Sequence, residues 1–135
     1  MPVIKKKGCK WLFVSHEEVS VDDIKNALKE IPNEPIWLAI EPVILHVCCR
    51  TLDKALGLLS KARDIGFKRS GLQSMHPKIM LELISTENLC TVLSYNGKML
   101  VSDEYLNSIV LESNKKLRKT KEKIKAFEGI IQQST

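Results

Sequence analysis

The stretch Ile36-Trp37-Leu38-Ala39-Ile40-Glu41-Pro42-Val43-Ile44-Leu45-His46-Val47-Cys48-Cys49 is the most apolar part of the chain. Its apolar and β-branched residues are typical of buried strands. Glu41 and Pro42 interrupt it, and a proline cannot donate a hydrogen bond to a neighbouring strand. The stretch therefore predicts two short strands, or one bent strand, buried near the centre of a sheet.

Upstream of this stretch, the sequence predicts a strand and then a helix. Residues 10–15 are rich in aromatic and β-branched types, which favours a strand. Ser20 suits the N-cap of the helix, where Asp22 and Asp23 interact favourably with the helix dipole. We expect this helix to end at Pro32, because proline cannot continue it.

Downstream, the pattern predicts a second helix, several short strands and a long final helix. Thr51 opens the second helix and Gly66 ends it. Asn96 and Gly97 are the signal of a tight hairpin turn, and Ser102 caps the final helix. The short strands are expected at residues 68–74, 78–84, 90–93 and 99–101. The fold class is therefore α+β, with a mixed, mostly antiparallel sheet packed against two or three helices and a long C-terminal helix.

The composition is that of an ordinary globular protein with an excess of positive charge. The 135 residues suit a single α+β domain over residues 1–135, and the net charge is +5. A basic surface favours a polyanion partner, but such charge also serves simply to keep a protein in solution. The charge alone leaves both interpretations open.

The cysteines and the N-terminal segment bear on the compartment. No Cys-x-x-Cys spacing occurs, so we expect no metal site and reduced, mostly buried thiols. The apolar run Trp11–Val14 is too short for the core of a secretory signal, and no run of about 18 apolar residues suits a membrane span. We therefore expect a cytoplasmic protein. The cysteines are Cys9, Cys48, Cys49 and Cys90.

Two residues of the central stretch are candidates for chemistry. In a strand over residues 43–50, alternation places His46 and Arg50 on the same face of the sheet. They could bind an anion or orient a base. The alternative is a hydrogen-bonded core histidine and an arginine that caps the sheet edge.

Three short polar segments follow or join the predicted elements. Ser15 and His16 end the first strand and could face a ligand cleft, or could simply form a local turn. Residues 67–71 supply Arg69, Ser70 and Gly71, which suit an anion contact or a solvated connector. A further candidate segment, Ser85-Thr86-Glu87, carries two hydroxyls and a carboxylate.

The final helix carries the densest positive charge. Such a run is usually a solvated helix face, but on a basic protein it is also a natural contact for a nucleic-acid backbone. The six glycines never form G-x-G-x-x-G, which disfavours a Rossmann-type nucleotide site, and 5% aromatic residues argue against a base-stacking platform as the main activity. The basic residues are Lys115, Lys116, Arg118, Lys119, Lys121, Lys123 and Lys125.

Five blocks, in order, resemble the wybutosine-synthesis tRNA methyltransferase family, the one that methylates N4 in the third step. The resemblance runs from about Gly8 to Lys116, which is nearly the whole chain. The blocks are Lys10-Trp11-Leu12-Phe13-Val14-Ser15-His16-Glu17, Glu41-Pro42-Val43-Ile44-Leu45-His46-Val47-Cys48-Cys49-Arg50, Gly66-Phe67-Lys68-Arg69-Ser70-Gly71, Ser85-Thr86-Glu87 and Leu100-Val101-Ser102-Asp103-Glu104-Tyr105-Leu106.

The resemblance implies a fold, a reaction and a set of site residues. It implies a fold other than the Rossmann-like one. It also implies methylation of a ring nitrogen of the wyosine-type guanosine next to the anticodon of phenylalanine tRNA. S-adenosylmethionine would be the methyl donor. His16, and after it His46, would accept or relay the proton. Arg50 and Arg69 would hold a carboxylate of the donor or of the base's side chain. The donor-binding set would be Ser15, Arg50, Ser70, Gly71, Ser85 and Thr86, and the tRNA-binding set Arg69, Lys115, Lys116, Lys119 and Lys123.

One departure concerns the N-terminus. The family carries an upstream segment with a Ser-Cys-Ser-Gly-Arg pattern, whereas this sequence starts at Met1, directly before the first matched block. We expect the 135 residues to be most of a longer family domain. The alternative to a methyltransferase is a non-catalytic RNA-binding module on the same scaffold, which would depend on the basic final helix rather than on the histidines.

Overall fold

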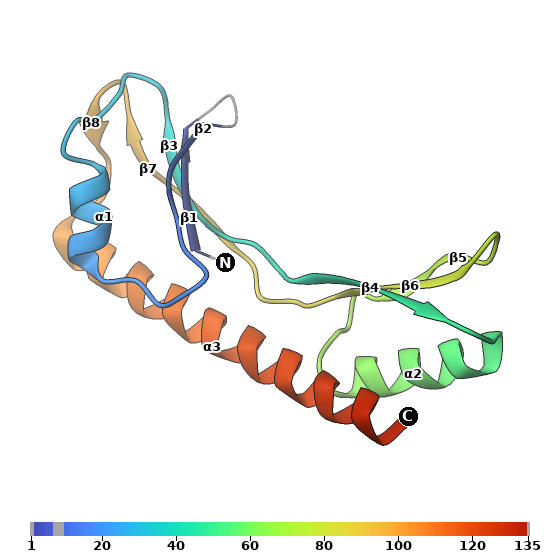
Figure 1. Ribbon diagram of the computed structural model, residues 1–135. Helices are drawn as coiled ribbons and strands as arrows, with labels where there is room; N and C mark the ends of the chain where they lie inside the picture. The colour runs from blue at the N-terminus through green and yellow to red at the C-terminus, as the bar shows by residue number, and fades with distance from the viewer. Residues whose placement is uncertain (1, 7–9, 135) are drawn as a thin grey trace. The chain divides into compact units, whose positions relative to one another are not determined.

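The computed structural model describes residues 2–6 and 10–134 (Figure 1). The chain divides into two compact units. The first contains Met1–Glu41 and Asn88–Arg118, and the second contains Pro42–Glu87 and Lys119–Thr135. Each unit pairs one antiparallel sheet with helices, which confirms the predicted α+β class. Cys9 lies outside the described residues.

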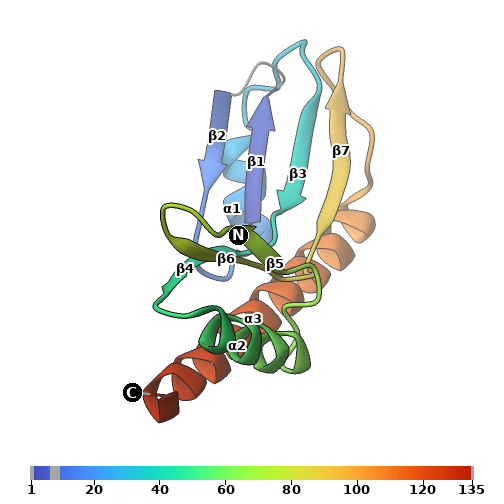
Figure 2. The same ribbon diagram turned by 90° about the vertical axis from the view of Figure 1, so that its right-hand side faces the viewer.

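The first unit contains one helix and a five-stranded sheet. The helix is α1 (Val21–Ala27). The strands are β1 (Pro2–Lys6), β2 (Lys10–Val14), β3 (Ile36–Ile40), β7 (Leu89–Tyr95) and β8 (Lys98–Met99). They lie in the order β2-β1-β3-β7-β8, and every pairing is antiparallel. Figure 2 shows β2, β1, β3 and β7 side by side, with α1 behind them.

The second unit contains a three-stranded antiparallel sheet and a helix. The strands are β4 (Ile44–Cys49), β5 (Gly71–Ser74) and β6 (Ile79–Ile84), in the order β4-β6-β5. The helix is α2 (Leu52–Asp64), whose N-cap Thr51 accepts a hydrogen bond from the Lys54 amide. Ala55, Leu59 and Ala62 lie on the buried face of α2 and pack against Leu81 and Leu83 of β6.

The last helix, α3 (Asp103–Ser134), belongs to both units. Its Leu106 and Val110 pack in the first core with Ile24, Leu38 and Leu93. Its Phe127 packs edge-on against Phe67 in the second core, with ring centroids 5.8 Å apart. Although α3 has 32 residues, none of the described helices is long and apolar enough to cross a membrane.

Most predicted elements are present, with shifted ends. The predicted caps of Ser20 and Ser102 are confirmed, and Asp23 completes a capping box with Ser20. The turn at Asn96 and Gly97 is also confirmed, with φ angles of 52° and 76°. α1 ends at Ala27 rather than at Pro32, because the backbone of the C-cap residue Leu28, with φ −105° and ψ 19°, has left the helical conformation. β1 was not predicted, since five residues with two lysines give little signal.

The central apolar stretch forms two strands, which confirms one of the two predicted alternatives. β3 lies inside the five-stranded sheet and is almost completely buried, as expected. The expectation of a central position is wrong for β4, which is an edge strand of the other sheet with one face exposed. The expected burial of the thiols is also wrong, since Cys48 and Cys90 are exposed and Cys49 is half-buried.

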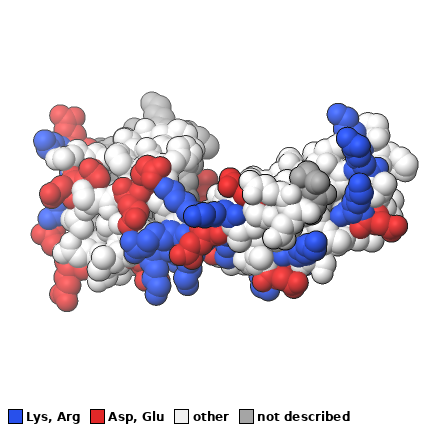
Figure 3. Space-filling model, turned by 60° about the horizontal axis from the view of Figure 1, so that its bottom comes forward, with Lys and Arg blue, Asp and Glu red and all other residues white. Residues whose placement is uncertain are grey.

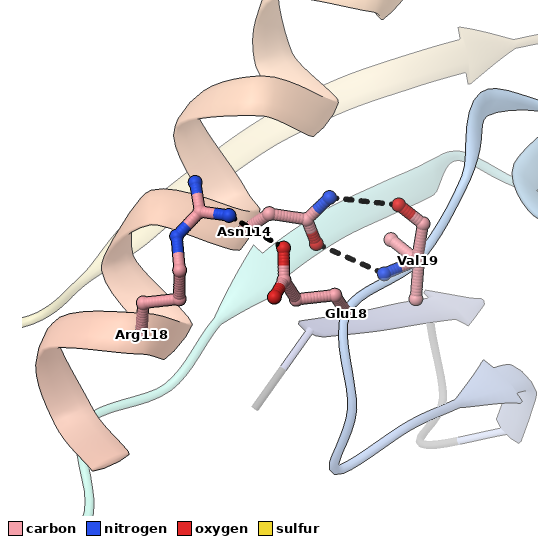
Figure 4. A network of polar contacts seen from close by, with 4 residues as sticks. All are labelled: Glu18, Val19, Asn114 and Arg118. Atoms are coloured by element: carbon pink, nitrogen blue, oxygen red, sulfur yellow. Dashed lines mark hydrogen bonds and ion pairs between the residues drawn. The ribbon is translucent and has the colours of Figure 1, made fainter. Parts of the chain in front are cut away.

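Asn114 of α3 ties the segment before α1 to the first unit (Figure 4). Its Oδ1 accepts a hydrogen bond from the Val19 amide at 2.9 Å, and its Nδ2 donates one to the Val19 carbonyl at 2.8 Å. One turn further along, Arg118 pairs with Glu18 at 2.7 Å. The amide side chain thus satisfies both backbone groups of a buried residue, as burial of polar groups requires.

We expect Asn114→Ala to lower the free energy of unfolding by about 2 kcal/mol, because it leaves both backbone groups of Val19 without a partner. Urea denaturation followed by circular dichroism measures this change. Asn107→Ala is the matched control: Asn107 is exposed on the same helix, so its loss should change stability by less than about 0.5 kcal/mol. Equal effects of the two substitutions would contradict the prediction.

Candidate functional site

His46 and Glu82 form a polar pair at the middle of the three-stranded sheet. They are cross-strand partners in β4 and β6, and His46 Nε2 lies 2.9 Å from Glu82 Oε2. An ionised carboxylate only accepts hydrogen bonds, so Nε2 carries the ring proton. In the neutral ring, Nδ1 is then the unprotonated nitrogen and can act as a base. Both side chains remain in contact with solvent, 47% and 36% exposed.

This pair lies on the open face of the sheet. As predicted, alternate residues of β4 point to opposite faces: Leu45 and Val47 pack against the second core, whereas His46 is exposed. Across the sheet, Gly71 of β5 pairs with Glu82, and no atom lies within 4 Å of the position where a Cβ of Gly71 would be. The space beside the His46–Glu82 pair is therefore free for a ligand.

Arg50 lines a cavity of about 390 Å³ against α2 and the end of α3. Lys54 and Lys61 of α2 line it as well, and Leu58 and Ile131 contribute apolar surface. Within residues 2–6 and 10–134, the three cations have no acidic partner. Three unpaired cations beside apolar walls suit an anionic group on an apolar body.

The two adjacent thiols at this cavity differ in environment. Cys48 and Cys49 both line it, but only Cys49 is turned toward the second core. Burial, and after it the neighbouring Cys48, raises the pKa of the Cys49 thiol. Cys49 therefore stays protonated at neutral pH, which makes it a poor nucleophile.

Ser70 and Ser85 hold backbone segments together. The buried Ser70 hydroxyl accepts a hydrogen bond from the Ile84 amide at 2.9 Å, and Arg63 donates to the Ser70 carbonyl at 2.7 Å. The fully buried Ser85 hydroxyl accepts one from the Val43 amide at 3.0 Å. Both serines lie at strand ends of the second unit, where the hydroxyls replace missing ladder bonds.

Lys123 reaches from α3 to the segment after β6. Its ammonium forms an ion pair with Glu87 and donates a hydrogen bond to the Thr86 hydroxyl at 3.2 Å. The ion pair is desolvated, since the Lys123 side chain is 17% exposed and that of Glu87 is 5% exposed. Gly66, with a φ of 122°, has a backbone conformation that favours glycine, and the Lys123 side chain passes the side where a Cβ would stand.

The Lys123 ammonium determines the charge state of Glu87. Burial alone raises the pKa of the Glu87 carboxyl. The hydrogen bond and the charge of Lys123 oppose this effect, together with hydrogen bonds from the Glu87 backbone and Ser85. The resulting pKa is below the ordinary value of 4.5. The carboxylate is therefore ionised at neutral pH. Its Oε2 is buried and has no hydrogen-bond partner among the described residues.

Ser15 and His16, two predicted residues of the first unit, lie in the loop after β2. The Ser15 hydroxyl donates to the Glu17 carbonyl at 2.9 Å and accepts from the Glu17 amide at 3.0 Å, which is the local turn that the sequence allowed. His16 is exposed beside it. Within the described residues, no ion pair joins His16 to a carboxylate, in contrast to His46.

The predicted tRNA-binding residues differ in availability. Arg69, Lys115 and Lys119 are exposed, whereas Lys116 is half-buried and Lys123 is held by Glu87. Acidic side chains lie among the basic ones on the face drawn in Figure 3. This part of the chain is therefore a mixed surface rather than an unbroken positive one.

The second unit thus brings together most of the predicted site residues, together with three that the sequence did not single out. Glu82, Lys54 and Lys61 were missed, although Glu82 is the one charged residue within the apolar run of residues 79–84. A lone carboxylate in an apolar strand is a usable signal, but its partner is known only from the strand register.

The comparisons with known proteins agree with the α+β fold. A solved structure of the PH1069 protein from Pyrococcus horikoshii superposes with a TM-score of 0.90 at 35% identity, covering 96% of this chain and 71% of that one. The family described as methyltransferase TYW3 matches residues 2–133. The fold and the matched sequence therefore define a methyltransferase-family domain that is not of the Rossmann type. The chain belongs to the TYW3 methyltransferase family.

Named relatives come from archaea and vertebrates. A Pyrococcus furiosus protein named tRNA(Phe) 7-((3-amino-3-carboxypropyl)-4-demethylwyosine(37)-N(4))-methyltransferase 1 is 39% identical over 127 residues, which are 93% of this chain and 65% of that protein. A Xenopus laevis protein named tRNA wybutosine-synthesizing protein 3 homolog is 39% identical over 129 residues, 95% of this chain and 51% of that protein. The chain thus spans between half and two thirds of the length of these relatives.

We expect Lys123→Met to lower the free energy of unfolding by about 3 kcal/mol at pH 7, because it leaves the buried Glu87 carboxylate without a cation. Urea denaturation checks this, with Lys125→Met as the control at an exposed position of the same helix.

The lowered pKa of Glu87 means that the ion pair stabilises the fold above pH 4.5. This contribution is lost as the pH falls through the folded-state pKa. The difference between variant and wild type should therefore shrink in acid, and a constant difference would contradict the assignment.

Proposed function

We propose that the chain transfers a methyl group from S-adenosylmethionine to N4 of the wyosine-type guanosine beside the anticodon of phenylalanine tRNA, in the cytoplasm. The match of the TYW3 methyltransferase family to residues 2–133 carries this proposal. The Pyrococcus furiosus relative is named for this methylation, and the Xenopus laevis relative for wybutosine synthesis. These names support an enzyme over the alternative of a non-catalytic RNA-binding module.

The cavity at Arg50 fits one end of the methyl donor. Its volume of about 390 Å³ lies within the range of about 300–1,000 Å³ usual for small-molecule sites. Arg50, Lys54 and Lys61 would hold the carboxylate of the donor's amino-acid part, and Leu58 and Ile131 would contact its apolar atoms. When bound, S-adenosylmethionine supplies an electrophilic sulfonium methyl group.

The His46–Glu82 pair would remove the proton that the ring nitrogen loses when it gains the methyl group. Glu82 holds the proton on Nε2, so Nδ1 is the nitrogen that accepts. The imidazolium that forms keeps its bond to the carboxylate and is stabilised by its charge. We assign this role to His46 rather than to His16, because a carboxylate orients His46.

The remaining predicted residues separate into three roles. Ser70, Ser85 and Thr86 would act indirectly, because their hydroxyls already accept bonds from the chain itself. Gly71 would give the substrate room beside the His46–Glu82 pair, and Ser15 would fix its loop. The tRNA phosphates would be contacted by Arg69, Lys115, Lys116 and Lys119. Lys123 would not contribute, because its ammonium is paired with Glu87.

Calorimetric titration of the purified chain with S-adenosylmethionine should show one saturable site. Arg50→Gln should weaken the binding about 10- to 100-fold, because it removes a charge-assisted hydrogen bond to the carboxylate. Lys29→Gln, which removes an exposed charge of the first unit, is the control and should bind as the wild type does. Equal affinity of the Arg50 variant would show that the donor's carboxylate binds elsewhere.

His46→Gln should lower kcat for methyl transfer to tRNA carrying the demethylated base by about 100-fold or more, since it removes the general base. Mass spectrometry of the nucleoside measures the product. Donor and tRNA affinities should stay within about twofold of the wild type. His76→Gln, an exposed histidine in the β5–β6 connection, is the matched control. Unchanged kcat in the His46 variant would refute the assignment, and loss of tRNA binding alone would favour a binding module.

A further inference from the structure

One side of α2 is turned toward the cavity of about 390 Å³ at Arg50. Four residues of the helix line this cavity, and their spacing along the chain places them on one face of the helix. They are Lys54, Gly57, Leu58 and Lys61. Gly57 lies between the two lysines, about one turn from each. An anion that both lysines contact therefore lies near the middle of this stretch, over Gly57.

The fold itself does not require a glycine at residue 57. Glycine in the interior of a helix is unfavourable, because it loses more conformational freedom on folding than alanine does. The positive φ angles of the described glycines occur at Gly66 and Gly97, not at Gly57. Apart from its chain neighbours and the helix backbone, no described atom lies within 4 Å of the position where a Cβ of Gly57 would be.

A further use of glycine is to let a bound molecule come close to the backbone. Gly129 of α3 also has open space at its Cβ position, but it is not among the residues that line the cavity. Gly57 differs from it because its open space belongs to the cavity and lies between two cations. The position of Gly57 therefore indicates a close approach of an anionic ligand to the backbone of α2.

We propose that Gly57 is a specificity-determining residue of the donor site, where the amino-acid part of S-adenosylmethionine lies directly on the backbone of α2. The carboxylate of the donor lies over Gly57, between Lys54 and Lys61. A side chain at residue 57 would occupy the space that these ligand atoms fill. In its choice of ligand the inference rests on the proposed function, and it adds the residue that sets how closely the ligand approaches the helix.

Calorimetric titration of Gly57→Ala with S-adenosylmethionine tests this directly. The affinity should fall about 10- to 100-fold, because the added methyl group overlaps with ligand atoms that contact the backbone. Gly57→Leu places a larger side chain there and should lower the affinity further. Gly129→Ala is the matched control, a helix glycine outside the cavity, and should bind as the wild type does. Wild-type affinity in both Gly57 variants would overturn the proposal.

Thermal unfolding without ligand separates lost contact from damage to the fold. Alanine favours a helix over glycine, so Gly57→Ala should raise the melting temperature by about 2–5 °C. Gly129→Ala should raise it by a similar amount for the same reason. A variant that is more stable and yet binds the donor more weakly supports the proposal. Weaker binding together with a lowered melting temperature would indicate a distorted α2 and overturn it.

Two analogues of the donor show which part of the ligand lies on Gly57. S-adenosylhomocysteine has the same amino-acid part and should lose affinity for Gly57→Ala as the donor does. 5′-Methylthioadenosine has the nucleoside and the sulfur without the amino-acid part, so its affinity should not change. An equal loss for 5′-methylthioadenosine would place the nucleoside at Gly57 and overturn the assignment.

These measurements need no tRNA, so they separate the inference from the proposed reaction. Weakened donor binding by Gly57→Ala, in a chain that does not methylate tRNA, would uphold the role of Gly57 and refute the reaction. Unchanged donor affinity in the Gly57 variants, with methyl transfer intact, would refute the role of Gly57 and leave the reaction standing. Absence of donor binding to the wild type would refute the donor site and the role of Gly57 together.

Discussion

Burial of the apolar stripe along α3 is the interaction on which both hydrophobic cores depend. Leu106 and Val110 complete the first core and Phe127 the second, while most lysines of the same helix are exposed. A helix this rich in charge gains most of its stability from packing, since propensity alone is a small term. Each sheet in turn needs this helix, because an antiparallel sheet buries one face and leaves the other open.

The open faces follow from that constraint, and they present polar and aromatic side chains to solvent. On the three-stranded sheet the open face presents the His46–Glu82 pair, and on the five-stranded sheet it presents Trp11 and Trp37. The helices supply buried polar contacts instead: Asn114 satisfies the backbone of Val19, and Lys123 neutralises Glu87.

The aromatic content gives no information on where the rings lie. The aromatic fraction of 5% argues against base stacking as the main activity, and the strand register places both tryptophans in one exposed row of the first sheet. A count over the whole chain carries no information on register. The lysines of α3 likewise look equivalent in the sequence. In the structure they differ, because Lys123 forms a buried ion pair with Glu87.

The sequence by itself determined the α+β class, the caps at Ser20 and Ser102, the turn at Asn96 and the alternation along β4, because these depend on residues within a few positions of one another. The five ordered blocks also identified the family. Only the tertiary structure decided that the central stretch divides between two sheets, that Glu82 partners His46 and that Glu87 partners Lys123. Those pairs are 36 residues apart in the chain, and strand register and helix packing alone bring them into contact.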